Sequence, residues 1–332
     1  MEKVYVITGG CGYVGYSVVK KLANENAKIK VLAIPSEDSS MVKALGAEIF
    51  IGDVRKKETI EPLFADKDAE YVIIHIAGIV TVETAFNQFV WDVNVEGTKN
   101  MLELAKEHKA KSFVYLGSVD AIPPVKDKVY SDYDKFNPDD VVTIYAKTKA
   151  VAINEVKKAA EEGLNACCVL PTAVFGPDDY ANGMVSKMLA SYAKGNVALP
   201  LIEGGYDFVD VRDLADGIIA ATTKGRPGEI YILSGKYVSV FDFINEVRAY
   251  RNLSPAKIKL PNAVSKTVGF FSENLSKLTK KPPVFTPYTI DCINSGVLYS
   301  PEKAEKELGY KCRPRSESIK DMIDFMEKEN RL

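Results

Sequence analysis

Residues 8–15 read Thr-Gly-Gly-Cys-Gly-Tyr-Val-Gly, and this stretch decides the fold. An apolar run, Val4–Ile7, comes just before it, and a helical pattern with Val18 and Leu22 on one face follows. Glycines at this point permit a tight turn and let the backbone approach a pyrophosphate. The start of the next helix presents free N–H groups and a partial positive charge. Strand, glycine turn and helix in this order predict a dinucleotide-phosphate loop.

Two glycine spacings overlap in this stretch. One is Gly10-x-Gly12-x-x-Gly15, and the other is Thr8-Gly9-x-x-Gly12-x-x-Gly15. A glycine pattern alone is also compatible with a purely structural turn. The choice between the two spacings therefore depends on residues further along the chain.

The bulk composition is that of an ordinary soluble globular protein, with 332 residues, 46% hydrophobic and 27% charged. This length allows one large domain or two intimate ones. A formal net charge of −2 gives no basic field for nucleic acid or an anionic membrane. No apolar run approaches the roughly 20 residues that span a bilayer. The first strand begins so early that we expect no signal peptide.

The metal-binding residue types are sparse. The chain has five cysteines and two histidines, His75 and His108, without a CxxC pair or a His/Cys cluster. We therefore expect no metal site and a reducing, cytoplasmic location.

Strands and helices alternate through the first two thirds of the chain. The expected strands are Val4–Thr8, Lys28–Ile34, Glu48–Ile51, Tyr71–Ile76, Ser112–Leu116 and Ala166–Leu170. The expected helices are Gly15–Asn24, Met41–Leu45, Glu58–Phe64, Trp91–Lys109 and Thr143–Glu162. Near-continuous apolar strands separated by helices predict an α/β protein with a doubly wound parallel sheet, the Rossmann arrangement.

The regular alternation of strands and helices ends after Pro171. The expected elements there are a helix at Gly183–Lys194, an extended segment at Phe208–Asp210, a helix at Arg212–Thr223, a strand at Glu229–Leu233, a helix at Val240–Tyr250 and a mostly helical tail from Leu260. We therefore predict a dinucleotide-binding core over residues 1–171, with 206–240 returning to it. Residues 172–205 and 241–332 are expected to form a smaller, mostly helical substrate-binding part.

Tyr145 and Lys149 are four residues apart, which places them on one helix face. A nearby ammonium favours phenolate, so Lys149 is expected to lower the pKa of Tyr145. Tyr145 can then exchange a proton with a substrate oxygen. The spacing alone is equally typical of a packed aromatic ring beside a solvated charge.

Three polar residues stand where expected strands end or helices begin. Ser118 follows the strand Ser112–Leu116, where its hydroxyl can bond a substrate oxygen or form a turn. Asn94 is interpreted as a helix cap or as a polar relay beside Lys149. Asp53 follows the third strand and either accepts from an adenine amino group or caps the next helix.

The motifs together resemble the extended short-chain dehydrogenase/reductase superfamily. They are Thr8–Gly15, Asp53, His75–Gly78, Asn94–Thr98, Ser118, Tyr145 with Lys149, Leu170–Pro177, Phe208–Ala215, Tyr299–Ala304 and Glu307–Tyr310. The resemblance covers nearly the whole chain and makes residues 9, 12 and 15 the operative glycines. It is closest to proteins that are similar to dihydroflavonol reductases and hydroxysteroid dehydrogenases.

The resemblance implies a role for each matching residue. Tyr145 is the implied acid/base, Lys149 binds the nicotinamide ribose, Ser118 polarises the substrate oxygen and Asn94 completes the relay. The implied cofactor contacts are Thr8, Gly9, Gly12, Tyr13, Val14, Gly15, Asp53, Val54, Ala77, Gly78, Tyr145, Lys149 and Pro171.

The sequence departs from the family pattern at two points. Leu170 stands where many members have an arginine. The second strand ends in Ala33-Ile34-Pro35, without the acidic residue that accepts from the NAD ribose or the arginine that pairs with the NADP phosphate. Ser36, Ser39 and Ser40 can bond a phosphate, whereas Glu37 and Asp38 repel one. The choice between NAD and NADP stays open at this point.

The substrate contacts are expected at Val80, Asp120, Tyr133, Ala173, Met184 and Phe208. Their largely apolar character predicts an NAD(P)-dependent oxidoreductase that reversibly reduces a ketone or aldehyde of an apolar small molecule. The alternative is a sugar-nucleotide epimerase or dehydratase, with Lys187, Lys194 or Arg212 binding the substrate diphosphate. A non-catalytic NAD(P)-binding sensor is a lesser alternative. The resemblance also implies a homodimer formed through the helices Trp91–Lys109 and Thr143–Glu162.

Overall fold

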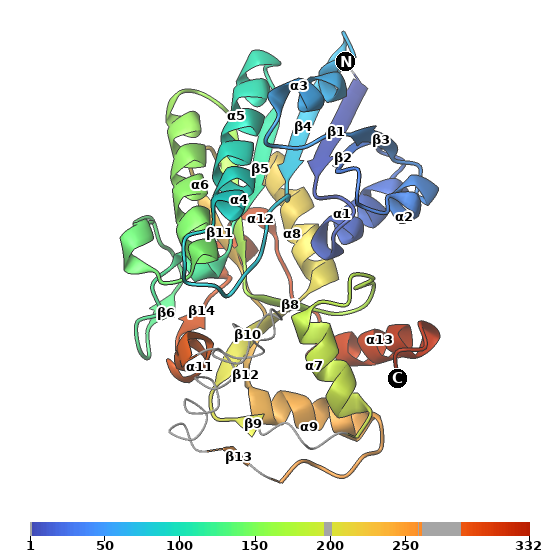
Figure 1. Ribbon diagram of the computed structural model, residues 1–332, viewed down its shortest axis with the longest axis vertical. Helices are drawn as coiled ribbons and strands as arrows, with labels where there is room; N and C mark the ends of the chain where they lie inside the picture. Colours follow the sequence, from blue (N-terminus) through green and yellow to red (C-terminus); the bar gives the residue numbers. More distant parts are fainter. Residues whose placement is uncertain (1, 196–200, 258, 261–286) are drawn as a thin grey trace.

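The computed structural model describes residues 2–195, 201–257, 259–260 and 287–332 (Figure 1). Its main sheet has seven strands in the order β11-β7-β5-β4-β1-β2-β3, with all neighbours parallel. Their bounds are β1 Glu2–Thr8, β2 Lys28–Ala33, β3 Glu48–Ile51, β4 Ala69–His75, β5 Ser112–Leu116, β7 Ala166–Pro171 and β11 Ile230–Leu233. The strand order reverses at β1 and β4. The C-terminal ends of these two strands therefore mark the place where open α/β sheets bind ligands.

Helices cover both faces of the sheet. One face carries α1 (Tyr13–Asn24), α2 (Ser40–Ala44), α8 (Val211–Lys224) and α12 (Glu302–Leu308). The other face carries α3 (Lys57–Ile60), α5 (Gly97–Glu107) and α6 (Ile144–Glu161). Each face buries its own apolar cluster. The expected doubly wound Rossmann architecture is confirmed.

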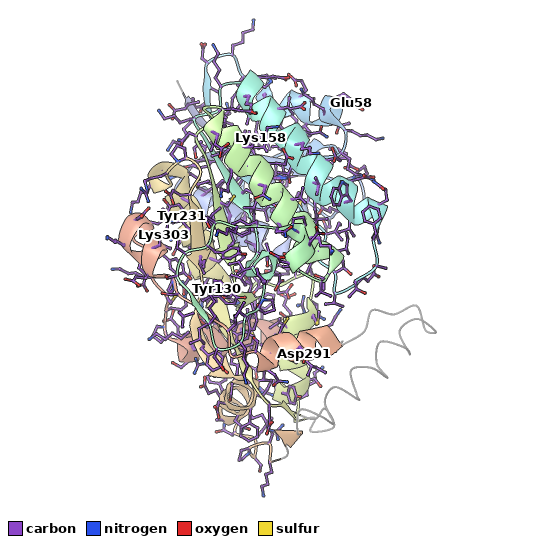
Figure 2. The ribbon with its side chains drawn as sticks, turned by 90° about the vertical axis from the view of Figure 1, so that its left-hand side faces the viewer. Glu58, Tyr130, Lys158, Tyr231, Asp291 and Lys303 are labelled. Carbon is purple, nitrogen blue, oxygen red and sulfur yellow. The ribbon has the colours of Figure 1, made fainter. Side chains whose placement is uncertain are left out.

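The edge strand β11 is protected by α12. Figure 2 shows Tyr231 of β11 beside Lys303 of α12, and the Lys303 ammonium lies 5.6 Å from the centre of the Tyr231 ring. Lys303 also pairs with Glu229, 2.6 Å away. A covered edge cannot pair with another strand, which limits aggregation.

A continuous helical stretch occupies the range where a helix was expected, Trp91–Lys109, but it begins earlier and contains a π-helical segment. A short α4 (Gln88–Trp91) begins at Asn87, whose side chain accepts from the N–H groups of Phe89 and Val90. A π-helical segment (Asp92–Glu96) follows before α5 begins at Gly97. π-Helical turns concentrate at functional sites, and this one contains Asn94.

The helix expected at Glu58–Phe64 is also divided. Only α3 is α-helical, and the segment Glu61–Phe64 that follows is a 3₁₀ helix with Pro62 near its start. Pro62 cannot donate a backbone hydrogen bond, so the α-helical pattern ends before it.

The smaller part contains a second sheet that the sequence pattern did not predict. It consists of β8 (Ala173–Phe175), β10 (Gly205–Asp210) and β12 (Lys236–Ser239) in the order β12-β10-β8. The helices α7 (Met184–Ala193), α9 (Val240–Tyr250) and α13 (Arg315–Lys328) share its apolar core. That core includes Phe175, Leu189, Phe208, Phe243, Ile319 and Met322.

The remaining described elements are short. The strand β6 (Val129–Tyr130) pairs with β14 (Leu298–Tyr299), β9 (Leu201–Ile202) pairs with β13 (Lys259–Leu260), and α11 spans Pro287–Asn294. Within residues 206–240, α8 and β11 join the main sheet, whereas β10 and β12 belong to the second sheet. Much of the tail that was expected to be helical, residues 261–286, lies outside the described residues.

Candidate active site

The glycine loop crosses the C-terminal end of β1 with almost no free space around its backbone. Gly9 has a φ of +70°, and a Cβ added there would lie 2.7 Å from the Ala77 nitrogen. A Cβ on Gly15 would lie 2.0 Å from the Gly9 carbonyl oxygen. These two positions require glycine because backbone atoms meet there. Gly12 is the N-cap residue of α1. Because glycine has no side chain, it leaves the first N–H groups of that helix without a side-chain cap.

Thr8 joins the loop to the end of β4. Its Oγ1 lies 2.6 Å from Nδ1 of His75 and accepts from the Ala77 N–H at 3.2 Å. The other ring nitrogen of His75 lies 3.0 Å from the Thr98 hydroxyl. Complete burial, and then the charge of Lys149, lower the pKa of His75 to about 3. His75 is therefore a neutral structural bridge.

Asn94 holds the chain just after Gly78. Its Oδ1 accepts from the Ile79 N–H at 2.7 Å, and its Nδ2 donates to the Ile79 carbonyl and the Thr148 hydroxyl, each at 3.0 Å. Asn94 is not a helix cap, because it lies inside the π-helical segment. A Cβ on Gly78 would lie 3.2 Å from Asn94 Oδ1 and 3.4 Å from Lys149 Nζ, so all three groups meet at one point.

Tyr145 and Lys149 lie on the first two turns of α6, both almost fully buried. The Lys149 ammonium lies 5.9 Å from the centre of the Tyr145 ring and donates to the Leu116 carbonyl at 2.6 Å. Leu116 ends β5, two residues before Ser118. The C-terminal end of β5 and the helix thus bring Ser118, Tyr145 and Lys149, three of the four predicted catalytic residues, into one group.

The expected depression of the Tyr145 pKa is wrong for this structure. Burial is the main cause that raises the pKa of Tyr145 well above its usual value, and the charge of Asp120 adds to the effect, whereas a hydrogen bond with Ser118 opposes it. Burial also lowers the pKa of Lys149 to about 7. This shift reduces the tendency of Lys149 to carry the charge that would lower the pKa of Tyr145. Tyr145 stays a protonated phenol, which is a proton donor.

Asp120 lies directly beside Ser118. The Ser118 hydroxyl donates to Asp120 Oδ2 at 3.2 Å and accepts from the Asp120 N–H, also at 3.2 Å. The Tyr206 hydroxyl of β10 donates to the other carboxylate oxygen at 3.5 Å. Desolvation by the surrounding protein raises the pKa of Asp120, while the Ser118 and Tyr206 hydroxyls lower it.

The predicted adenine contacts stand at the end of β3. The Asp53 carboxylate is bound by Arg55 at 2.5 Å, and the Arg55 guanidinium lies 4.8 Å from the centre of the Phe89 ring. The hydrogen bond from Arg55 lowers the pKa of Asp53. Asp53 is not the cap of α3, because Lys56 occupies that position. Val54 is buried against Gly97.

Buried polar atoms without partners also occur on the cofactor side. Within the described ranges, the Tyr13 and Thr172 hydroxyls are buried and make no hydrogen bond. Tyr13 begins α1, and Thr172 follows Pro171 at the end of β7. Buried hydroxyls of this kind ordinarily have partners. Together with the glycine backbone, they fit a polar ligand that lies across the ends of β1 and β7.

The six predicted substrate residues fall into different environments. Val80 is 73% and Met184 54% exposed, whereas Phe208 is only 8% exposed. The Phe208 ring packs 4.5 Å from that of Phe243, in the core of the smaller part. Tyr133 contacts the rings of Tyr130 and Phe136 edge-on and lies partly buried in the main core. Ala173 pairs with Phe208 across β8 and β10. The structure therefore brings Asp120 to the catalytic group and places Phe208 and Tyr133 in aromatic packing.

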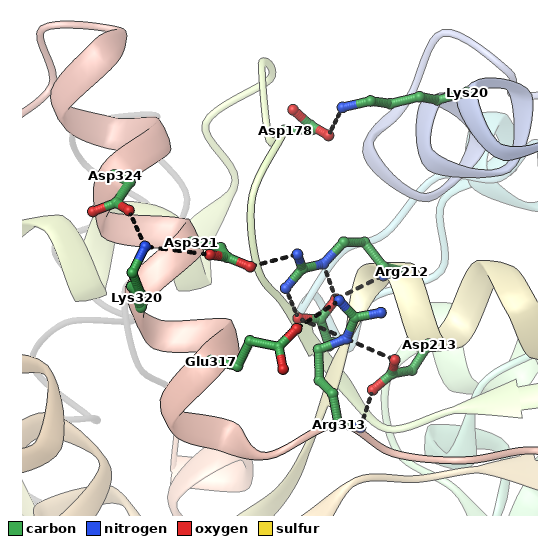
Figure 3. A network of polar contacts seen from close by, with 10 residues as sticks. Lys20, Asp178, Arg212, Asp213, Arg313, Glu317, Lys320, Asp321 and Asp324 are labelled. Carbon is green, nitrogen blue, oxygen red and sulfur yellow. Dashed lines mark hydrogen bonds and ion pairs between the residues drawn. The ribbon is translucent and has the colours of Figure 1, made fainter. Parts of the chain in front are cut away.

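Arg212 is not a free cation for a substrate diphosphate. Its guanidinium binds Asp210 at 2.7 Å and Asp321 at 2.6 Å, and Arg313 binds Asp213 at 2.7 Å in the same network (Figure 3). The network joins the start of α8 to α13. Of the three suggested cations, only Lys187 and Lys194 remain exposed.

Comparison with known proteins agrees with this geometry. Residues 5–234 match the model of the NAD dependent epimerase/dehydratase family. The chain belongs to this family. It is similar to sterol demethylase protein B of Methylococcus capsulatus, with 24% identity over 92% of each chain. It is also similar to a decarboxylating sterol-4-alpha-carboxylate 3-dehydrogenase of Schizosaccharomyces pombe, with 24% identity over 93% of each. The crystal structure of gox2253 superposes with a TM-score of 0.84 and 29% identity, over 99% of both chains.

Family membership confirms the extended short-chain dehydrogenase/reductase resemblance. The chain is an NAD(P)-dependent oxidoreductase of that superfamily, and it acts on small molecules. No helix in the described ranges is long and apolar enough to cross a bilayer. Nor do the described His, Cys, Asp and Glu residues form a group of three or more that could hold a metal ion.

Sequence reasoning missed several residues of the site. Tyr206 is separated from Asp120 by 86 positions and reaches it only through the second sheet. The Thr148 hydroxyl accepts a hydrogen bond from Asn94, and the Leu116 carbonyl accepts one from Lys149. The position of Thr148, between Tyr145 and Lys149 on α6, was the only available signal, and a backbone carbonyl leaves no signal in a sequence.

Proposed function

We propose that the protein reversibly reduces a ketone or aldehyde of a largely apolar small molecule. The observation that carries the proposal is the grouping of Ser118, Tyr145 and Lys149, with Tyr145 held as a neutral phenol. Bound NAD(P)H supplies the hydride to the carbonyl carbon. Tyr145 gives its hydroxyl proton to the carbonyl oxygen, and Ser118 donates a hydrogen bond to the same atom.

The other residues of the site position these groups. Lys149 and Asn94 converge beside Gly78, where the ribose of a bound nucleotide is expected. Gly9, Gly12 and Gly15 leave backbone N–H groups for the pyrophosphate. Val54 and Asp53 are proposed to contact the adenosine side, and Tyr13 is proposed to contact the cofactor at the start of α1.

An apolar substrate is favoured by three observations. The exposed side chains nearest in sequence to the site include Val80 after β4 and Met184 at the start of α7. Arg212, one of three candidates for binding a diphosphate, is already held by two carboxylates. The sterol enzymes among the relatives act on compounds of this apolar class. We therefore propose a fused-ring or similarly apolar ketone or alcohol.

A sugar-nucleotide epimerase or dehydratase is the alternative, because the matching family model is that of NAD dependent epimerases and dehydratases. The two are separated by net cofactor turnover with a panel of ketosteroids and of nucleoside-diphosphate sugars. Stoichiometric loss of NADH or NADPH absorbance with a ketosteroid supports the reductase. Product formed from a sugar nucleotide without net cofactor change rejects it. Cofactor binding without turnover of any compound supports the sensor.

We further infer that NAD is preferred over NADP. Glu37 turns back to accept from the Ile34 N–H at 3.1 Å, just beyond β2. Burial raises the pKa of Cys11, in the glycine loop, to about 11, and the charges of Glu37 and Asp38 contribute to this shift. Both carboxylates therefore act on the loop electrostatically and would repel a ribose phosphate. Asp38 also occupies the Ser40 N–H at 2.9 Å.

The preference is tested by the ratio of kcat/KM for NADPH to kcat/KM for NADH. Glu37→Gln is expected to raise this ratio roughly fivefold, which corresponds to about 1 kcal/mol between partly exposed charges. The control is Glu25→Gln, an exposed carboxylate after α1. A wild-type preference for NADPH, or an unchanged ratio in Glu37→Gln, contradicts the inference.

A further inference from the structure

A short segment of the smaller part lies against the helix that follows the glycine loop. Residues 177–183 form this strap, which connects β8 to α7. The Asp178 carboxylate of the strap accepts from the Lys20 ammonium of α1 at 2.6 Å (Figure 3). The Tyr180 ring of the strap meets the Tyr16 ring of α1 edge-on, with 5.3 Å between the ring centres. Tyr16 and Lys20 are four residues apart, so both contacts fall on one face of α1.

The strap also reaches Tyr13, the first residue of α1. Burial raises the pKa of the Tyr13 hydroxyl well above its usual value, and the charges of Asp179, Asp210 and Asp178 add to this shift. Asp179 is itself buried: one carboxylate oxygen accepts from the Gly183 N–H at 2.8 Å, and the other has no hydrogen-bond partner among the described residues. The strap therefore lies at the helix end where the pyrophosphate of a bound dinucleotide is expected.

The C-terminal segment holds the strap from the other side. The Arg331 guanidinium donates to the Asp179 carbonyl at 2.5 Å and to the Tyr180 carbonyl at 3.2 Å. The Phe325 ring of α13 meets the Tyr180 ring edge-on at 5.2 Å, and the Arg331 guanidinium lies 5.4 Å from the centre of the Phe325 ring. The strap is thus held between α1 of the main sheet and the end of α13.

The backbone of the strap depends on these outside contacts. Asp178 and Asn182 have φ angles of +67° and +52°, in the left-handed region that residues other than glycine seldom adopt. Such conformations persist where the surrounding structure holds them in place. We therefore expect the strap to change its conformation when the contacts from α1 or from Arg331 are removed.

We propose that the strap is a latch for the bound dinucleotide and that Arg331 holds it closed against the start of α1. With the latch closed, the first turn of α1 is fixed and the pyrophosphate dissociates slowly. With the latch open, water reaches Tyr13 and the free N–H groups of this turn, and the pyrophosphate dissociates faster. Arg331 is a positioning residue that acts on the cofactor through the strap. The inference is independent of which substrate the protein reduces.

A latch of this kind couples the strap and the cofactor in both directions. If the closed strap strengthens dinucleotide binding, a bound dinucleotide favours the closed strap by the same free energy. The competing explanation is that Arg331 only stabilises α13. That explanation predicts a loss of stability without a selective effect on cofactor dissociation, and strap dynamics that do not respond to the cofactor.

The experiment measures NADH dissociation and association by stopped-flow fluorescence. The dissociation rate constant is expected to rise about tenfold in Arg331→Ala, which loses two charge-assisted hydrogen bonds, while the association rate constant stays within about twofold of wild type. Arg331→Lys keeps the charge but not the two-armed guanidinium, so it should lie between the two. Hydrogen exchange of residues 177–183, measured by mass spectrometry, should slow in the wild type when NADH binds and should be faster in Arg331→Ala.

The matched control is Arg251→Ala, which removes the ion pair between Arg251 and Glu327 of α13 but does not touch the strap. Its NADH dissociation should equal that of the wild type. An unchanged dissociation rate in Arg331→Ala overturns the inference, as does an equal rise in Arg251→Ala. Strap exchange that is the same with and without NADH in the wild type also overturns it.

A second variant tests the latch from the α1 side. Lys20→Met removes the ion pair with Asp178 and should also raise the NADH dissociation rate. Lys21→Met is its control, because Lys21 pairs with Asp216 of α8 and not with the strap. If Arg331→Ala does not fold, this pair of variants decides the question: equal dissociation rates in Lys20→Met and Lys21→Met overturn the inference. None of these outcomes changes the proposed reduction, since no step of it uses the strap.

Discussion

The cofactor side and the substrate side of this molecule are built differently. On the cofactor side, the ends of β1, β4 and β5 present backbone groups and a few buried polar side chains, and most of these contacts join residues within the main sheet. On the substrate side, the contacts join distant elements: Tyr206 of β10 reaches Asp120 after β5, and Arg212 of α8 binds Asp321 of α13. Backbone-built sites leave a local motif in the sequence, whereas side-chain sites assembled between distant elements do not.

This difference explains why the glycine loop left a local signal in the sequence and the substrate side did not. Gly9 and Gly15 have conformations or contacts that exclude other residues. Phe208 and Met184 were predicted by the same reasoning from apolar character, yet one is buried and the other is exposed. Apolar character alone does not distinguish a core residue from a substrate contact.

The largest effect is expected at the catalytic group, where the two sides meet. Tyr145→Phe removes the phenol proton beside Ser118 and should lower kcat for ketone reduction by about 1,000-fold. NADH binding, measured by fluorescence titration, should change less than about threefold, because the ring and Lys149 remain. Tyr250→Phe is the control, since its hydroxyl binds Asp324 on α13. An active Tyr145→Phe variant would falsify the proposed mechanism.

Alanine substitutions at Phe208 and Met184 test which residue packs in the core and which contacts the substrate. Phe208→Ala should lower the free energy of unfolding by about 3 kcal/mol, because it leaves a cavity beside Phe243. Met184→Ala should change stability by less than about 0.5 kcal/mol and raise KM for an apolar ketone. Denaturant unfolding and steady-state kinetics measure the two effects. The comparison between the two residues fails if Phe208→Ala raises KM without loss of stability.

Alanine substitutions at two glycines of the loop separate effects on stability from effects on cofactor affinity. Gly15→Ala places a Cβ against the Gly9 carbonyl and should destabilise the protein by about 2 kcal/mol. Gly12→Ala has an ordinary φ of −79° and ordinary space, so its stability should change by less than about 1 kcal/mol. NADH affinity in Gly12→Ala should nevertheless fall roughly tenfold, because the Cβ adds bulk where the pyrophosphate lies. Equal stability of the two variants would contradict this assignment.

The last expected effect is a pH dependence of stability from Lys149. Burial holds its pKa at about 7, below the ordinary value of 10.5, so between these values the unfolded chain binds more protons than the folded chain. The Lys149 contribution to stability therefore rises with pH between about 7 and 10.5. Below about pH 7 the ammonium is charged in both states, and the full free-energy cost of burying it is present. Urea unfolding from neutral to alkaline pH should show wild type gaining stability relative to Lys149→Met. Lys158→Met, at an exposed position of α6, should show no such trend.

Much of the fold was predictable because buried parallel strands are continuous apolar runs. All seven main-sheet strands coincide with expected strands, although their ends differ by one or two residues. The π-helical segment around Asn94 was not predictable, because Asn94 bonds the Ile79 backbone, which belongs to another part of the fold. The strands β8 and β12 are short, with three and four residues, and pair only through β10, so they lack a periodic signal.

The sequence by itself determined the parallel sheet, the glycine loop and the Ser118–Tyr145–Lys149 set, because each depends on local spacing and on the position of a strand end. Only the tertiary structure decided the protonation of Tyr145, since burial outweighs the charge of a lysine that is itself desolvated. The tertiary structure also decided that Arg212 is held by two carboxylates and that Asp120 lies against Ser118 and Tyr206. These properties depend on distances between elements far apart in the chain, which no local pattern of residues encodes.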